Sequence, residues 1–124
     1  MSPKVSPIRS ANQLLASLSV SDFALLKPDL THVALELRME LEQPDVSIKQ
    51  IYFPEGGMVS IVANGSPQTQ AEVGIVGIEG VTGLAVILGN DRSPHHTYMQ
   101  VSASGQRIKA AKFREAMAKS ATFQ

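Results

Sequence analysis

From Leu30 onward the chain alternates apolar and polar residues with a period of two, in short segments that turn residues separate. Val33, Leu35 and Leu37 open this pattern, which is typical of β-strands with one buried face. Further strands are expected at about 51–53, 58–63, 69–76, 96–101 and 107–108, with an apolar run at 84–88. Turn signals fall between them at Pro44-Asp45, Pro54–Gly57, Asn64-Gly65, Gly77–Gly83, Gly89–Pro94 and Ser104-Gly105. Many short strands of this kind predict a β-roll or jelly roll rather than alternating strands and helices.

Helical patterns occur only at the two ends of the β segment. Ser10 is the expected N-cap of a first helix and Ser21 of a second, so short helices cover about residues 10–28. Ala110–Ser120 is expected to be a helix with Phe113, Ala116 and Met117 on one face. The 124 residues therefore predict one mainly β domain over 1–124, with the roll at about 31–108 and the last helix at about 110–120.

Composition excludes several function classes. Eleven basic residues balance eleven acidic ones, so the chain has no overall field that would hold DNA or a membrane surface. The chain has no cysteine, which excludes disulfides and thiolate chemistry and agrees with the cytoplasmic location that we expect. Neither a signal peptide nor an apolar run long enough to span a membrane is recognisable, so we expect no membrane association.

The expected interior of the roll is a set of apolar residues from the strand segments, with Phe113 and Met117 covering one end. The set is Val59, Ile61, Val73, Ile75, Leu84, Val86, Leu88, Met99 and Val101. If a long helix normally packs beside this domain, some apolar surface near Phe113, Met117, Ala121 and Phe123 is left exposed, and such surface favours self-association, so we expect a homodimer.

Three segments resemble, in order, the sensory domain of Crp/Fnr-type regulators. They are Tyr52–Ser60 (YFPEGGMVS), Glu72–Gly80 (EVGIVGIEG) and Gly89–Pro94 (GNDRSP). The resemblance covers roughly residues 12–113 and implies a double-stranded β-helix, or jelly roll, that is cyclic-nucleotide-binding-like. It also implies a long dimerisation helix and a DNA-binding domain, which this chain lacks, so DNA is expected to be bound only through a C-terminal domain outside it. The chain is then either part of a longer regulator or a natural stand-alone sensor.

The resemblance places a phosphate-binding turn at the glycine-rich segment. Backbone N–H groups of such a turn attract an anion, and glycine allows close approach. Two side chains normally complete the site, a glutamate and an arginine. Gly83 stands at the glutamate position and His95 or His96 at the arginine position, which weakens phosphate binding, because a neutral histidine lacks the charged fork of arginine. The candidate ligand-binding residues are Gly80, Val81, Thr82, Gly83, Leu84, Arg92, Ser93, His95, His96 and Thr97.

Arg92 is a possible substitute for the missing arginine, although Asp91 beside it can neutralise its charge. Three ligand states remain open: a cyclic nucleotide, another small-molecule effector, or no ligand at all. We expect a degenerate nucleotide pocket and no resident cofactor.

Two other kinds of chemistry fit the sequence less well. His95-His96 suggests a cupin-like metalloenzyme on a similar roll, but adjacent residues of a strand point to opposite faces and chelate poorly, so we expect no metal. The serines lack a nucleophile motif, and Glu72 with Glu79 is a weak acid/base pair. The sequence therefore predicts a regulatory sensor domain without catalytic residues.

Overall fold

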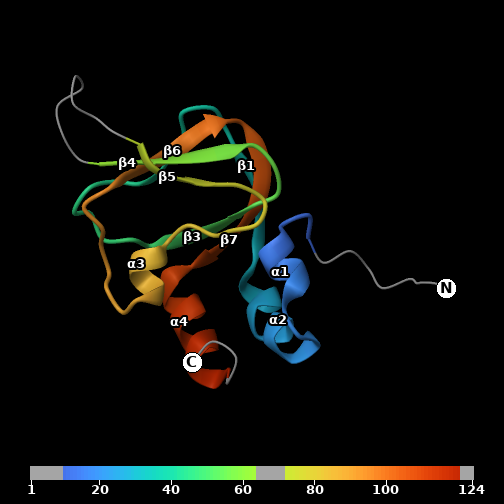
Figure 1. Cartoon of the computed structure of the whole chain (residues 1–124). Coiled ribbons are helices and arrows are strands. Elements are labelled where there is room, and N and C mark those ends of the chain that lie inside the picture. Colours follow the sequence, from blue (N-terminus) through green and yellow to red (C-terminus); the bar gives the residue numbers. More distant parts are fainter. Residues whose placement is uncertain (1–9, 64–71, 121–124) are drawn as a thin grey trace.

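The computed structural model describes residues 10–63 and 72–120, and its strands form two antiparallel sheets (Figure 1). The first sheet has three strands in the order β1-β7-β3, and the second has four in the order β2-β6-β4-β5. The strands are β1 (Thr31–Leu35), β2 (Glu40–Glu42), β3 (Gln50–Pro54), β4 (Met58–Val62), β5 (Glu72–Val76), β6 (His96–Val101) and β7 (Ala103–Lys109). The antiparallel jelly roll expected from the period-two pattern is confirmed.

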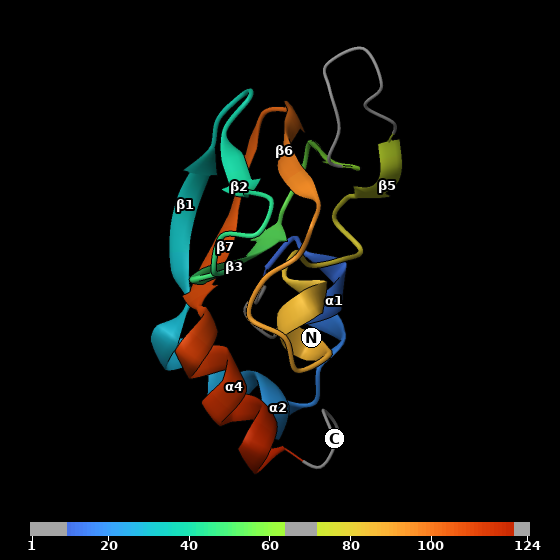
Figure 2. The same cartoon turned by 90° about the vertical axis from the view of Figure 1, so that its left-hand side faces the viewer.

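The helices gather at one end of the roll, as the two views of Figures 1 and 2 show. They are α1 (Gln13–Ser17), α2 (Val20–Leu26), α3 (Leu84–Ile87) and α4 (Ala110–Lys119), with a 3₁₀ turn at Lys27–Asp29. The end helices agree with the expected segments. In the described part of the chain, no helix combines the length and the apolar character that crossing a membrane requires.

The expected N-caps of the first two helices are wrong by two residues each. Asn12 caps α1, and its side-chain oxygen accepts a hydrogen bond from Leu15 N, whereas Ser10 Oγ accepts from Asn12 N. Ser19 caps α2 in place of Ser21 by accepting from Asp22 N at 3.1 Å. Serine and asparagine are both good caps, so tertiary contacts decide which one is used.

Two apolar clusters stabilise the fold, and β3 contributes to both. Ile51 and Phe53 point toward the helices, where Phe53 lies 6.4 Å from the ring of Phe113. Tyr52, between them in sequence, points into the space between the sheets. The inter-sheet cluster is Leu35, Leu41, Tyr52, Val59 and Met99. Both faces of β3 are therefore buried, which explains its continuous apolar character.

Several residues expected in the interior are exposed. Val59, Val86 and Met99 are buried, but five others of the expected set have about half or more of their surface exposed: Val73, Ile75, Leu84, Leu88 and Val101. The run 84–88 forms the short helix α3 instead of a strand, so its leucines do not alternate into the roll. Phe113 is 4% exposed, as expected for a residue that covers one end of the roll, while Ala121 and Phe123, expected near an exposed apolar surface, lie outside the described residues.

Ser104-Gly105 does not end a strand, because both residues lie inside β7. A Cβ at Gly105 would come 2.6 Å from the carbonyl oxygen of Phe53, so this glycine permits close approach of β7 to β3. The predicted hairpin at Asn64-Gly65 lies outside the described residues.

Candidate functional site

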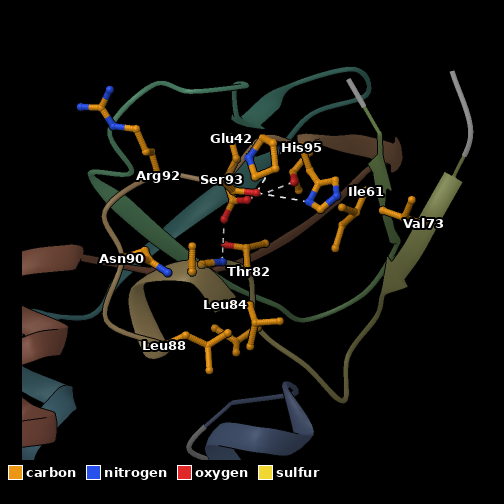
Figure 3. A pocket seen from close by; sticks show the side chains of 15 residues that line it. Glu42, Ile61, Val73, Thr82, Leu84, Leu88, Asn90, Arg92, Ser93 and His95 are labelled. Atoms are coloured by element: carbon orange, nitrogen blue, oxygen red, sulfur yellow. Dashed lines mark hydrogen bonds between the residues drawn. The ribbon is translucent and has the colours of Figure 1, made fainter. Parts of the chain in front are cut away.

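A cavity of about 430 Å³ opens between α3, the glycine-rich turn and the second sheet (Figure 3). Aliphatic side chains make much of its wall, from Ile61 on β4, Val73 on β5 and Leu84 on α3. The full lining is Glu42, Ile61, Val73, Val81, Thr82, Gly83, Leu84, Ala85, Leu88, Asn90, Arg92, Ser93, Pro94, His95 and Thr97. A mainly apolar cavity of this size with a few converging polar groups is typical of a small-molecule site.

Glu42 places a carboxylate inside this cavity. Its Oε2 accepts a hydrogen bond from the backbone N–H of Gly83 at 2.6 Å, and its Oε1 accepts one from Thr97 Oγ1 at 3.1 Å (Figure 3). Thr97 is 1% exposed, and Gly83 is buried as well. The carboxylate thus joins the end of β2 to β6 and to the turn that precedes α3.

A β-bulge in β2 directs Glu42 inward. In the antiparallel pairing with β6, Glu40 lies opposite Tyr98 and Glu42 lies opposite Thr97, so two steps along β2 match one step along β6. Residues two apart in a regular strand share a face, whereas the bulge puts these two glutamates on opposite faces. Glu42 therefore lines the cavity, while Glu40 lies 2.6 Å from His96 outside it.

The glycine-rich turn is held by buried side chains around it. Asn12, fully buried, donates from Nδ2 to the carbonyl oxygens of Pro54 at 2.7 Å and Gly80 at 2.9 Å. Thr82 Oγ1 accepts from Tyr52 N, and Thr82 N donates to the Tyr52 carbonyl, both at 3.0 Å. These bonds tie the turn to β3 and fix the rim of the cavity.

Gly83 has a left-handed backbone conformation, which other residue types adopt only with strain. Its φ of 77° is in the left-handed region, and a Cβ there would lie 2.8 Å from Ile51 Cγ1. A glycine therefore lets the turn approach β3 while its N–H points at Glu42.

Eight of the ten predicted site residues line the cavity, and two do not. Gly80 instead supplies its carbonyl oxygen to Asn12, and His96 lies on the other face of β6 with its ring centroid 5.4 Å from that of Tyr98. Arg92 reaches the edge of the lining, but Figure 3 shows its side chain pointing away from the cavity. Its guanidinium lies 3.5 Å from Asp91 and donates to the Asp45 carbonyl at 3.3 Å.

The paired histidines point to different places. His95 lines the cavity, where its Nδ1 lies 3.3 Å from Ser93 Oγ, whereas His96 faces Glu40. Within residues 10–63 and 72–120, no three His, Asp or Glu side chains come together in an arrangement that could hold a metal ion.

Comparison with known proteins gives matches in structure alone. No family model and no curated protein matches the sequence. A cyclic nucleotide-binding-like protein from Brucella abortus superposes with a TM-score of 0.66 at 18% identity, over 85% of this chain and 90% of that one. The sensor domain of the transcriptional regulator DNR from Pseudomonas aeruginosa gives 0.71 at 13% identity, over 90% and 83%.

A third match is the regulatory subunit of a cAMP-independent protein kinase A from Trypanosoma brucei. It superposes with a TM-score of 0.72 at 14% identity, over 86% of this chain and 39% of that one. All three share the antiparallel roll described above. The chain has the cyclic-nucleotide-binding-like fold.

Sequence reasoning about this cyclic-nucleotide-binding-like domain missed Glu42, the one carboxylate among the described residues that line the cavity. Leu41 is buried and both of its neighbours are glutamates, a pattern that indicates two solvated side chains on one strand face. Only the β-bulge places Glu40 and Glu42 on opposite faces of the strand, and the local sequence gives no signal of the bulge. The other lining residues that were not among the predicted site residues are Ile61, Val73, Ala85, Leu88, Asn90 and Pro94.

Proposed function

We propose that this chain is the ligand-sensing or regulatory domain of a Crp/Fnr-type transcription regulator, and that its cavity excludes cyclic nucleotides. The fold and the preformed cavity support a sensing role. One structural neighbour is the sensor domain of a transcriptional regulator, and another belongs to a cAMP-independent kinase, so this fold is also found in a protein that is independent of cAMP.

The observation that carries the exclusion of cyclic nucleotides is the contact between Glu42 and Gly83. The Gly83 N–H belongs to the turn that the resemblance assigns to phosphate binding, and the Glu42 carboxylate already accepts its hydrogen bond at 2.6 Å. A phosphate would have to displace that carboxylate or lie beside it. Two like charges about 4 Å apart near a protein surface repel by about 4 kcal/mol before salt screening.

The described residues that line the cavity do not supply the two side chains that normally bind the ribose and the phosphate of a cyclic nucleotide. Gly83 has no side chain to meet a ribose hydroxyl, and His95 offers an imidazole ring in place of the permanently charged, forked guanidinium. Arg92 is bound to Asp91 and to the Asp45 carbonyl at the edge of the lining. Among the described residues that line the cavity, Glu42 therefore presents a carboxylate to an anionic ligand, and Arg92 does not point toward it.

Calorimetric titration with cyclic AMP and cyclic GMP tests this proposal. We expect the unaltered protein to bind either nucleotide more weakly than about 10 μM, which corresponds to about −7 kcal/mol. Glu42→Ala should raise the affinity about tenfold, because it removes the charge and frees the Gly83 N–H. The matched control Glu40→Ala removes a carboxylate of the same strand outside the cavity and should change nothing.

Two results would contradict the proposal. Binding by the unaltered protein tighter than about 10 μM would show a working phosphate site. Equal affinities of the unaltered protein and the Glu42→Ala variant would show that this carboxylate does not exclude the nucleotide.

Regulation in this proposal acts through the arrangement of a homodimer in the cytoplasm, without catalysis. A small-molecule effector switches the protein only if it binds one dimer arrangement better than the other. DNA is contacted through a C-terminal domain outside this chain. Sedimentation velocity tests the dimer: a species of twice the chain mass at micromolar concentration supports it, and a monomer across that range contradicts it.

A further inference from the structure

Among the described residues, the cavity combines an apolar wall with one carboxylate that faces inward. Ile61, Val73 and Leu84 supply aliphatic surface from three different elements, and Glu42 projects among the polar side chains at the other side (Figure 3). Its volume of about 430 Å³ is in the range of small-molecule sites, roughly 300–1,000 Å³.

The Glu42 carboxylate is only partly satisfied by the protein. A carboxylate offers about four acceptor positions, and the structure shows two hydrogen bonds to it, from Gly83 N and Thr97 Oγ1. Within residues 10–63 and 72–120, no Lys, Arg or His forms an ion pair with Glu42. Acceptor capacity and a negative charge thus remain inside a largely apolar cavity.

The nearby cation does not neutralise this charge. Arg92 is held at the edge of the lining by Asp91 and the Asp45 carbonyl, and its side chain points away from the cavity. His95 lies inside, but its Nδ1 is within 3.3 Å of Ser93 Oγ. An uncompensated carboxylate in an apolar environment is stabilised by a cation, which supplies both charge and hydrogen-bond donors.

We propose that the cavity binds an organic amine in its protonated form, with the ammonium group donating to Glu42 and an apolar body against Ile61, Val73 and Leu84. The proposal rests on the proposed sensing function and names the chemical class of the effector. It assigns Glu42 two roles, because the same carboxylate that repels a phosphate attracts an ammonium group. Gly83 and Thr97 hold the carboxylate in place for the ligand.

A set of probes with one body and different head groups tests this directly. Phenethylamine, phenethyl alcohol and phenylacetate carry the same ring with a cationic, neutral or anionic group, and methylammonium carries the cation without the ring. Affinities are measured by titration under amide chemical-shift detection in the unaltered protein. We expect the amine to bind about tenfold or more tightly than the alcohol, and the alcohol more tightly than the acid. Methylammonium should bind more weakly than phenethylamine, because it lacks the apolar body.

Three variants separate the roles of charge and apolar wall. Glu42→Gln should lower the amine affinity about tenfold or more, to near that of the alcohol, while the matched control Glu40→Gln keeps the preference. Leu84, 63% exposed, can be changed without opening the core, and Leu84→Ala should weaken amine and alcohol alike by about three- to tenfold.

The outcomes distinguish this proposal from the proposed function. Equal binding of amine and alcohol, or tighter binding of the acid, overturns the amine assignment while leaving a small-molecule cavity that excludes nucleotides. A failure of all the probes to bind also overturns it. Tight cyclic nucleotide binding overturns the exclusion of cyclic nucleotides on which the proposed function rests. The ranking of probes on the unaltered protein stands as a test even where a variant fails to fold.

Discussion

Asn12 offers the sharpest test of how the cavity rim is held. Its side chain caps α1 by accepting from Leu15 N at 3.0 Å, and its Nδ2 donates to the carbonyl oxygens of Pro54 and Gly80 at 2.7 and 2.9 Å. The cap contributes about 1 kcal/mol, and each of the other two bonds contributes about 1 kcal/mol. Asn12→Ala should therefore lower the free energy of unfolding by about 3 kcal/mol.

A matched comparison isolates the two bonds to the rim. Ser19→Ala removes the N-cap of α2, which accepts from Asp22 N, and should cost only about 1 kcal/mol. Asn12→Asp keeps an acceptor for the cap but turns a carboxylate toward two carbonyl oxygens in a fully buried position, so it should cost at least as much as the alanine variant.

Urea unfolding followed by circular dichroism measures these differences, and thermal unfolding should show a decrease in Tm of about 10 °C for Asn12→Ala. Equal losses for Asn12→Ala and Ser19→Ala would refute the reasoning, because they would show that the bonds to the glycine-rich turn contribute nothing to stability.

Two further predictions concern the same turn. Gly83→Ala should lower the free energy of unfolding more than Gly89→Ala. Both glycines have positive φ, so either substitution costs about 1–2 kcal/mol in backbone strain, but only the alanine at position 83 places a Cβ 2.8 Å from Ile51 Cγ1. Equal losses in urea unfolding would contradict this reasoning. Thr82→Val should cost about 1–3 kcal/mol, because it leaves the buried Tyr52 N–H without its acceptor; retention of full stability would show that this bond is dispensable.

Much of the fold follows from local sequence patterns. The period-two alternation predicted β1, the glycine-rich stretch 77–83 predicted the turn beside the cavity, and the apolar spacing of Phe113 and Ala116 predicted α4. These elements have strong local signals, because a strand or helix with one buried face must repeat its apolar residues with the period of its backbone.

The differences arise where tertiary contacts choose between local alternatives. Residues 84–88 form a five-residue apolar run, and periodicity cannot separate a strand from a short helix at that length. Ser10 and Asn12 are both able to cap α1, but only asparagine supplies the two donors that Pro54 and Gly80 accept. Ser104-Gly105 was predicted to be a turn, since glycine is common in turns. The actual role of Gly105 is to allow close packing of β7 on β3, and the local sequence gives no signal of that contact.

The sequence predicted which backbone segments line the cavity, but it did not predict the carboxylate inside it. The sequence resemblance located the turn and the loop that line the cavity, and it indicated the loss of a glutamate and an arginine. It could not show that Glu42 enters from β2, because that placement depends on a one-residue bulge against β6. The charge inside the cavity was therefore missing from the sequence prediction.

The amide proton of Gly83 provides the most direct measurement of the central claim. A short hydrogen bond to a carboxylate, here 2.6 Å between Gly83 N and Glu42 Oε2, moves an amide proton downfield and protects it from exchange with solvent. In Glu42→Ala the Gly83 resonance should move upfield and exchange faster, while in Glu40→Ala it should stay in place. An unchanged Gly83 resonance in the Glu42→Ala variant would show that this carboxylate does not occupy the turn.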